Sequence, residues 1–276
     1  MFGVFQAPNY VDVAGARIAV ESRGSGRPLV LVHGFGADRH TWDGLWDRLA
    51  ADRRVVGVDL RGCGESIESS PTTFNHARDL ELVLDALEID QTDLMGVSLG
   101  GAVSISLALD APERVRRLVL IGPGLTGWEW TAAWRELWFA IISAARAGRL
   151  DEARDLWWNH PLFAPTRRVE SAAAELRRSI DAYSCRQWID KDRHERVQPD
   201  LGRLHELAAP ALILTGTDDY EDFRTIADIF AATVPDAIRI DFEGGGHLLH
   251  LEQPDAVVEE VARFLGAGTA AFLQRE

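Results

Sequence analysis

Asp93-Leu94-Met95-Gly96-Val97-Ser98-Leu99-Gly100-Gly101 is the stretch of the sequence that decides the fold. The apolar run that ends at Val97 is typical of a strand buried on both faces of a parallel sheet, and residues 99–109 follow it with a helical pattern. Ser98 is therefore expected on a tight turn between a strand and a helix, where Gly96 and Gly100 have no Cβ atoms to collide. Such a turn predicts a nucleophilic serine raised above the edge of the sheet. The alternative is a Gly-Ser turn that only caps the helix.

Strands and helices alternate on both sides of this turn. Further strands are expected at residues 17–20, 29–32, 55–58, 118–121, 211–214 and 237–240, and further helices at residues 42–51, 74–87, 222–232 and 254–265. Alternation at this spacing is typical of parallel strands joined by crossover helices. The sequence therefore predicts an α/β fold with a mostly parallel central sheet flanked by helices.

Residues 124–206 interrupt the alternation, because only helical patterns are found there. We expect them to form a helical cap inserted into a core made of residues 1–123 and 207–276. The insertion has equal numbers of acidic and basic residues and holds seven of the nine tryptophans, so it is neutral and rich in aromatic side chains. Seven of its aromatic residues are candidates for the wall of a substrate pocket: Trp128, Trp130, Trp134, Trp138, Trp157, Trp158 and Phe163. The alternative is that this aromatic stripe only packs the cap onto the core.

A serine nucleophile needs an imidazole base close to it. His247 follows the last expected strand in a glycine-rich loop, at the sheet edge where Ser98 is also expected and where open α/β sheets place their sites. His250 is the nearest rival, but it stands three residues further on, at the beginning of a helix. We therefore predict that His247 is the base.

The base in turn needs a carboxylate that orients it. Two adjacent acids, Asp218 and Asp219, come after the strand at residues 211–214, again at the carboxyl edge of the sheet. The corresponding position after the strand at residues 118–121 reads Gly122-Pro123-Gly124 and holds no acid. The residues themselves leave the choice between Asp218 and Asp219 open.

Acyl transfer to a serine also requires backbone N–H groups that stabilise the developing oxyanion. The strand at residues 29–32 leads into His33-Gly34-Phe35-Gly36, a loop in which the glycines allow a backbone amide to turn toward the site. The amides of Phe35 and Leu99 are the predicted donors. We interpret His33 as a structural hydrogen-bonding residue rather than as a base.

These elements together resemble the α/β-hydrolase superfamily over nearly the whole chain, and they follow its order of serine, aspartate and histidine. The resemblance rests on His33-Gly34-Phe35-Gly36, Asp59-Leu60-Arg61-Gly62-Cys63-Gly64-Glu65-Ser66, the turn at residues 96–101, Gly216-Thr217-Asp218-Asp219, and Gly246-His247 followed by Glu252-Gln253-Pro254. It implies Asp219 as the carboxylate, because the acid in these enzymes usually stands three residues after the glycine that ends the strand. It also implies that the cap lies over the nucleophile, and that Asp59 and Arg61 hold the fold together rather than bind substrate.

The resulting hypothesis is a serine hydrolase that cleaves carboxylic esters or lactones of medium-sized hydrophobic substrates. Ser98 attacks the carbonyl, His247 takes its proton, Asp219 orients the imidazole, and the amides of Phe35 and Leu99 hold the oxyanion. Relatives that open epoxides or remove halide use an aspartate in place of the serine, so Ser98 argues against both reactions.

Two alternatives remain open. The same residues could hydrolyse a C–C bond or perform another triad-dependent reaction, although Leu248 stands where such C–C hydrolases often have tryptophan. The chain could also be a small-molecule receptor that turns over slowly.

Composition restricts the partners further. The net charge of −14 disfavours nucleic acid and anionic membrane surfaces as partners. Cys63 and Cys185 are too few and too far apart for a disulfide framework or a zinc site, and we expect neither a metal nor a cofactor. No signal or membrane segment is recognisable, so a cytoplasmic monomer or homodimer is expected.

Overall fold

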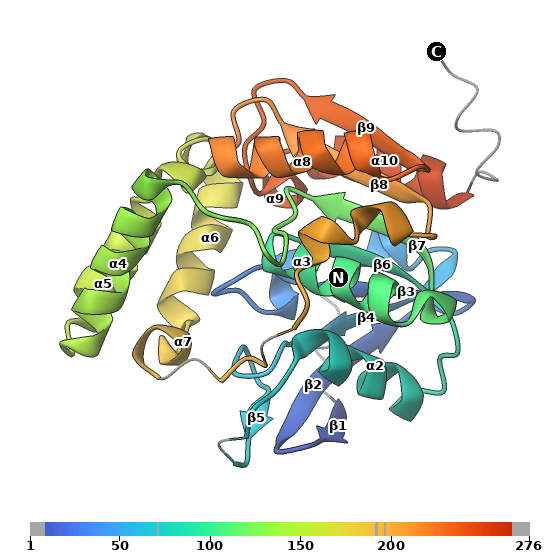
Figure 1. Ribbon diagram of the computed structural model, residues 1–276, viewed down its shortest axis with the longest axis horizontal. Helices are drawn as coiled ribbons and strands as arrows, with labels where there is room; N and C mark the ends of the chain where they lie inside the picture. The colour runs from blue at the N-terminus through green and yellow to red at the C-terminus, as the bar shows by residue number, and fades with distance from the viewer. Residues whose placement is uncertain (1–8, 71, 191–192, 196, 267–276) are drawn as a thin grey trace.

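The computed structural model describes residues 9–70, 72–190, 193–195 and 197–266, and it is built around one central sheet (Figure 1). The strands are β1 (Asn9–Val13), β2 (Ala16–Arg23), β3 (Arg27–Val32), β4 (Arg53–Val58), β5 (Ile67–Glu68), β6 (Thr92–Val97), β7 (Val115–Ile121), β8 (Ala211–Gly216) and β9 (Ala237–Phe242). Their order in the sheet is β1-β2-β4-β3-β6-β7-β8-β9, and β5 pairs with β2. All neighbours from β4 to β9 are parallel, whereas β2 is antiparallel to each of its partners. The predicted fold class is therefore confirmed.

The core lies on both faces of the sheet, since alternate residues of the central strands point to opposite sides. Val30 and Val32 of β3 belong to one buried cluster, and Leu29 and Leu31 belong to the other. The first cluster includes residues of α2 (His76–Ala86), α3 (Leu99–Asp110) and α8 (Glu221–Thr233), and the second includes residues of α1 (Trp46–Leu49) and α10 (Pro254–Gly266). Burial on both faces explains why these strands have uniformly apolar sequences.

The segment between β7 and β8 contains no strand among its described residues and forms helices that lie beside the sheet (Figure 1). They are α4 (Ala132–Arg146), α5 (Leu150–Trp158), α6 (Glu170–Ala182) and α7 (Arg186–Ile189), with short 3-10 turns at Pro161–Phe163, Thr166–Arg168, Asp200–Gly202 and Leu204–Glu206. Helix α4 packs against α5 and α7, and α6 packs against α5 and against α9 (Leu249–Glu252) of the core. We refer to residues 124–206 as the cap.

The structure differs from the sequence-based expectation in one helix and in two strands, β1 and the two-residue β5, which the sequence does not predict. The helix expected at residues 42–51 is broken into a 3-10 turn, Arg39–Trp42, and the short α1, with Gly44 between them. Glycine lowers the stability of a helix interior, which accounts for the break. Strand β1 was not expected, because its burial pattern leaves only Val11 in the core. None of the helices in the described ranges combines the length and the apolar character needed to cross a lipid bilayer.

Candidate active site

Ser98 occupies a strained turn between β6 and α3. Its backbone has φ 54° and ψ −116°, a region that a residue with a Cβ rarely adopts and that costs about 1–3 kcal/mol. The turn is held by the Ser98 N–H, which donates to the Ile121 carbonyl, and by the Ser98 carbonyl, which accepts from the Gly124 N–H at 2.9 Å. A Cβ at Gly96 would lie 2.3 Å from the Gly100 carbonyl oxygen, so only glycine fits there. The strain and its supports agree with the predicted nucleophile turn.

The structure brings His247 and Asp219 together in the interior. Nδ1 of His247 lies 3.1 Å from both carboxylate oxygens of Asp219, and both side chains are buried. Gly122 allows this approach, because a Cβ there would lie 2.9 Å from His247 Nδ1 and from Asp219 Oδ2. Asp218 instead points outward and pairs with Arg168 at 2.9 Å. The geometry thus distinguishes the two acids that the sequence left open.

The second ring nitrogen of His247 is not engaged by the protein. His247 Nε2 is buried and has no hydrogen-bond partner among the described residues. His247 and Ser98 line one cavity. His247 Nε2 is therefore available to a proton carried by another group in that cavity, which is what a general base requires.

His250, the rival histidine, has a different environment. It is buried, and its Nε2 lies 2.8 Å from the Thr41 hydroxyl oxygen. Burial, and to a smaller extent the charge of His247, lower the pKa of His250 to about 3. His250 thus stays neutral at ordinary pH and supports the cavity wall rather than an acid–base cycle.

The loop that carries His247 is held by the carboxylate of Glu252, for which the sequence predicts no separate role. Its carboxylate accepts hydrogen bonds from the Gly246 N–H, the Leu248 N–H at 3.2 Å and the Thr166 hydroxyl at 2.6 Å. These donors include the backbone amides on both sides of His247, and Thr166 belongs to the cap. The sign of this role in the sequence is the run Glu252-Gln253-Pro254, which is one of the segments that carry the family resemblance.

The predicted oxyanion donors lie beside Ser98. Both Phe35 and Leu99 line the Ser98 cavity, and a Cβ at Gly34 would lie 3.4 Å from the Ser98 Cβ, so the loop after β3 passes directly over the serine. Neither the Phe35 amide nor the Leu99 amide donates a hydrogen bond within the described part of the chain. His33 is buried beneath the loop, where its Nε2 accepts from the Leu60 N–H and its Nδ1 donates to the Gly34 carbonyl. This arrangement agrees with the structural interpretation of His33.

The cavity above Ser98 has a volume of about 700 Å³ and a mainly apolar wall. Five of the seven predicted aromatic residues line it: Trp130, Trp134, Trp138, Trp157 and Phe163. They pack on one another, with Trp130 stacked on Trp134 at 4.5 Å and Trp157 edge-on to Phe163 at 4.8 Å between ring centroids.

For Trp128 and Trp158 the predicted pocket position is wrong, since neither lines this cavity in the described structure. Trp128 is held away from it by a hydrogen bond from Nε1 to Asp222 at 2.9 Å. Trp158 is half-buried and lies under the guanidinium groups of Arg167 and Arg177. Residues 157 and 158 are consecutive on α5 and therefore point about 100° apart around the helix, and only Trp157 lines the cavity.

A second cavity of about 330 Å³ adjoins the first. The two share the wall residues Phe35, Leu99, Trp138 and Ile142. The remaining wall of the smaller cavity is rich in charged and histidine side chains: Arg61, Arg146, Arg186, Arg193, Glu68, Asp190, His76 and His194. The predicted oxyanion donors Phe35 and Leu99 thus border both an apolar cavity and one with a charged wall.

Arg61 and Asp59 hold structural positions, as expected. Arg61 makes two hydrogen bonds of 2.8 Å to the Asp79 carboxylate on α2, and Asp59 is fully buried beside Arg39. Cys63 and Cys185 are buried free thiols, and burial raises the pKa of Cys63 to about 12. No cluster of three metal-ligating side chains is found among the described residues.

The comparisons with known proteins agree with this architecture. Residues 27–254 match the family model described as alpha/beta hydrolase fold. The chain therefore belongs to the alpha/beta hydrolase fold family.

Individual relatives differ in the reactions that their names describe. The 2-hydroxymuconate semialdehyde hydrolase of Pseudomonas sp. (strain CF600) is 38% identical over 148 residues, 51% of this chain and 52% of that protein, so the match spans about half of that relative's length. The pimeloyl-[acyl-carrier protein] methyl ester esterase of Nitrosomonas europaea is 27% identical and covers 88% of this chain and 97% of its own. Among solved structures, the esterase RhEst1 from Rhodococcus sp. ECU1013 superposes with a TM-score of 0.80 at 26% identity, covering 95% of this chain and 99% of that one.

Proposed function

We propose that the protein is a serine hydrolase of carboxylic esters or lactones with medium-sized hydrophobic groups. One observation carries this proposal: Ser98, in its strained turn, shares an apolar cavity with His247, whose Nδ1 is bound to Asp219 and whose Nε2 is free of other partners among the described residues. The esterases among its relatives support the same reaction class.

In the proposed reaction, Ser98 Oγ attacks the carbonyl carbon while His247 Nε2 takes the hydroxyl proton. The Phe35 and Leu99 amides donate to the oxyanion of the tetrahedral intermediate. When the intermediate collapses, the C–O bond to the leaving alcohol breaks and His247 returns the proton to that oxygen. Water then attacks the acyl-enzyme with His247 as base again, which releases the acid and regenerates Ser98.

The cavity supports a medium-sized apolar substrate. A volume of about 700 Å³ lies within the range of about 300–1,000 Å³ found for small-molecule sites. The two charged residues on its wall are already engaged, since Arg135 donates to the Trp130 carbonyl and Glu175 pairs with Arg178. Aliphatic or aromatic esters and lactones therefore fit the wall better than polyanions do.

A second candidate is hydrolysis of a C–C bond in a substrate that carries a carboxylate. A muconate semialdehyde, the substrate in the name of the relative at 38% identity, has carboxylate and aldehyde groups but no ester. In the smaller cavity beside Phe35 and Leu99, Arg146 would suit such a carboxylate, since it forms no ion pair among the described residues, whereas the other three arginines of that wall are paired with acids.

The test compares initial rates on p-nitrophenyl acetate, butyrate and octanoate for the wild-type protein and Ser98→Ala. The proposal expects hydrolysis at ordinary enzyme rates with an optimum in chain length, and a loss in kcat of about 10⁴-fold or more in the variant. A difference below tenfold between the two proteins would refute Ser98 as the nucleophile. The C–C hydrolase would be favoured if both proteins turned over all esters slowly and the wild-type protein cleaved a vinylogous 1,5-diketo acid in a reaction that depends on Ser98. A receptor would be favoured if the protein bound a ligand without turnover.

A further inference from the structure

The loop at residues 34–38, which carries the proposed oxyanion donor Phe35, is held from its outer side by helix α6 of the cap. The Ser179 hydroxyl donates to the Gly36 carbonyl at 3.2 Å, and Arg178 Nη2 donates to Asp38 Oδ1 at 3.3 Å. The Phe35 ring also packs among cap aromatics, including Trp138 with 5.0 Å between ring centroids. The cap therefore contacts both the backbone and the side chains of this loop.

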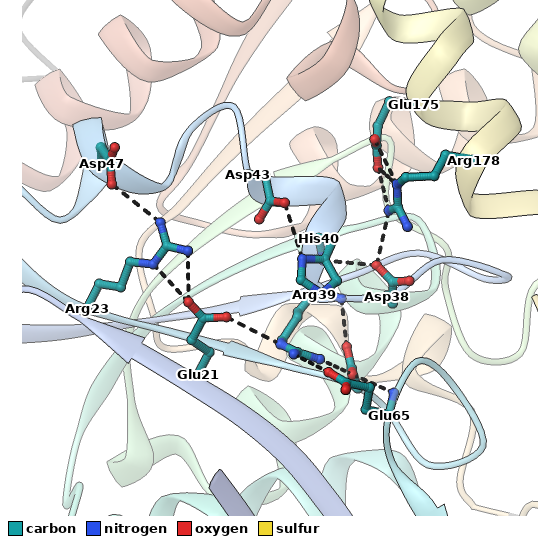
Figure 2. A network of polar contacts seen from close by, with 11 residues as sticks. Glu21, Arg23, Asp38, Arg39, His40, Asp43, Asp47, Glu65, Glu175 and Arg178 are labelled. Carbon is teal, nitrogen blue, oxygen red and sulfur yellow. Dashed lines mark hydrogen bonds and ion pairs between the residues drawn. The ribbon is translucent and has the colours of Figure 1, made fainter. Parts of the chain in front are cut away.

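The same loop is anchored to the core on its other side. Arg39, whose side chain is 3% exposed, forms an ion pair with the fully buried Asp59, and its backbone N–H donates to Asp59 Oδ1 at 2.7 Å. Figure 2 shows Asp38 reaching Arg178 on α6, while the next residue, Arg39, turns to Glu21 and Glu65. Two consecutive side chains thus tie the end of the loop to opposite partners, one in the cap and one in the core.

The contact at Gly36 bears directly on the direction of the Phe35 amide. Gly36 has φ 70°, a left-handed conformation that glycine adopts without a steric penalty and therefore leaves with equal ease. Because that torsion lies one residue after Phe35, the hydrogen bond from Ser179 to the Gly36 carbonyl restrains the segment that aims the Phe35 N–H. An oxyanion donor is effective only when it is fixed in advance at hydrogen-bonding distance from the developing charge.

We propose that Arg178 and Ser179 are positioning residues for the oxyanion hole: through them, α6 holds residues 34–38 in the conformation in which the Phe35 N–H faces the reacting carbonyl. The inference rests on the proposed function, because it takes Phe35 as an oxyanion donor. The cap then does more than line the substrate cavity, because its contacts with residues 34–38 affect the rate of the chemical step.

A matched control is available on the same helix. Arg177 and Arg178 are adjacent on α6 and have the same side-chain exposure of 41%, but Arg177 pairs with Asp155 and Asp181 inside the cap. Arg177→Ala removes the same charge and the same side chain without touching residues 34–38. The comparison of the two variants separates the contacts of Arg178, with Asp38 and with Glu175, from a general loss of charge or of helix stability. Ser179→Ala then tests the hold on the loop without disturbing the pair between Arg178 and Glu175.

The experiment measures kcat and KM on a p-nitrophenyl ester, together with the inhibition constant of an alkylboronic acid, for wild type, Arg178→Ala, Ser179→Ala and Arg177→Ala. Boronic acids form a tetrahedral adduct with serine hydrolases, so their affinity reports on the oxyanion donors. Loss of one hydrogen bond of ordinary strength predicts that Arg178→Ala and Ser179→Ala each lower kcat about fivefold to tenfold. The inhibition constant should rise by a similar factor, KM in Arg178→Ala should stay within about twofold, and Arg178→Lys should recover part of the loss.

Three results would overturn the proposal: an unchanged kcat in both variants, an equal loss in Arg177→Ala, or a change in KM alone. The last result would mean that Ser179, which also lines the main cavity, only contacts substrate.

Hydrogen exchange separates this proposal from the proposed function. If the wild-type protein shows no Ser98-dependent ester hydrolysis, the proposed function fails, and exchange of the backbone amides of residues 34–38 then tests the restraint directly. Exchange that is at least about fivefold faster in Arg178→Ala and Ser179→Ala, but not in Arg177→Ala, supports α6 as the restraint on the loop. Unchanged exchange in both variants overturns it.

Discussion

Replacement of Glu252 by glutamine tests whether the His247 loop depends on one buried carboxylate. Glu252 accepts from the amides of Gly246 and Leu248 and from the hydroxyl of Thr166, and it is 9% exposed. Glutamine keeps the shape of the side chain but has one acceptor oxygen, so its NH₂ group must face a donor. The Thr166 hydroxyl can rotate to accept, whereas a backbone N–H cannot.

The magnitude follows from these contacts. At least one loop amide loses its partner, and the remaining hydrogen bonds lose their charged acceptor; hydrogen bonds to charged groups are worth about 1.5–3 kcal/mol each. We expect Glu252→Gln to lower the free energy of unfolding by about 2–4 kcal/mol, which corresponds to about 5–10 °C in Tm for a chain of this size. Because a shift of about 1 Å in a reacting group can cost about 100-fold in rate, kcat should fall about 10-fold to 100-fold.

The assay combines thermal unfolding with ester kinetics, and Glu259→Gln on the exposed face of α10 is the control. Glu259 is 70% exposed and pairs only with Arg263 in the described structure, so its replacement should change neither quantity measurably. A Glu252→Gln protein whose kcat stays within twofold of wild type would show that the loop holds His247 without the carboxylate. A fall in Tm with unchanged kcat would assign Glu252 to stability alone.

Three further predictions concern the turn, the buried histidine and the cavity wall. Gly96→Ala should cost about 2 kcal/mol or more of folding stability, measured by urea denaturation, because its Cβ would lie 2.3 Å from the Gly100 carbonyl oxygen; an unchanged midpoint would contradict the geometry. The pKa of His250 is lowered to about 3 in the folded protein, so the unfolded chain binds a proton at higher pH than the folded protein does. The free energy of unfolding is therefore unaffected by His250 above pH 6.5 and decreases as the pH falls toward 3, by up to about 1.4 kcal/mol per pH unit. Without this group, in His250→Gln, the fall in Tm between pH 7 and pH 5 should be smaller. Trp157→Ala should alter the chain-length preference in kcat/KM, whereas Trp158→Ala should leave it within twofold of wild type, and equal effects would contradict the cavity assignment.

The sheet and the residues at its carboxyl edge could be predicted because their signals are local. A strand that is buried on both faces must be apolar throughout, as in residues 94–97, and the glycines on either side of Ser98 mark a turn that no larger residue fits. The parallel order of the strands then brings the ends of β6, β8 and β9 to one edge, which is why Ser98, His247 and the pair of acids at residues 218 and 219 could be predicted without a structure, whereas the preference for Asp219 came from the family resemblance.

Contacts between distant segments could not be predicted in this way. Nothing near Glu252 in the sequence indicates that its carboxylate meets Thr166, 86 residues away, and nothing near Asp38 indicates Arg178, 140 residues away. The orientation of the cap aromatics has the same cause, because Trp157 and Trp158 are chemically equivalent until the packing of α5 decides which of them faces the cavity. These contacts and side-chain orientations depend on long-range packing, which the periodicity of the sequence does not predict.

The two long-range contacts have a common consequence for the cap. Thr166 of the cap donates to the Glu252 carboxylate, which supports the His247 loop, and Ser179 of the cap donates to the loop that carries Phe35. The cap therefore contacts the groups that position the proposed base and the proposed oxyanion hole. A change in the cap that enlarges the cavity at Phe163 need not disturb either contact, because that side chain lines the cavity, whereas Trp157 also packs edge-on to the Phe35 ring, with 6.1 Å between ring centroids. A change that tilts α6 or moves the turn at Thr166–Arg168 disturbs one contact or both. Substrate preference and catalytic rate should therefore be separable at Phe163 and coupled along the surface where the cap meets the core.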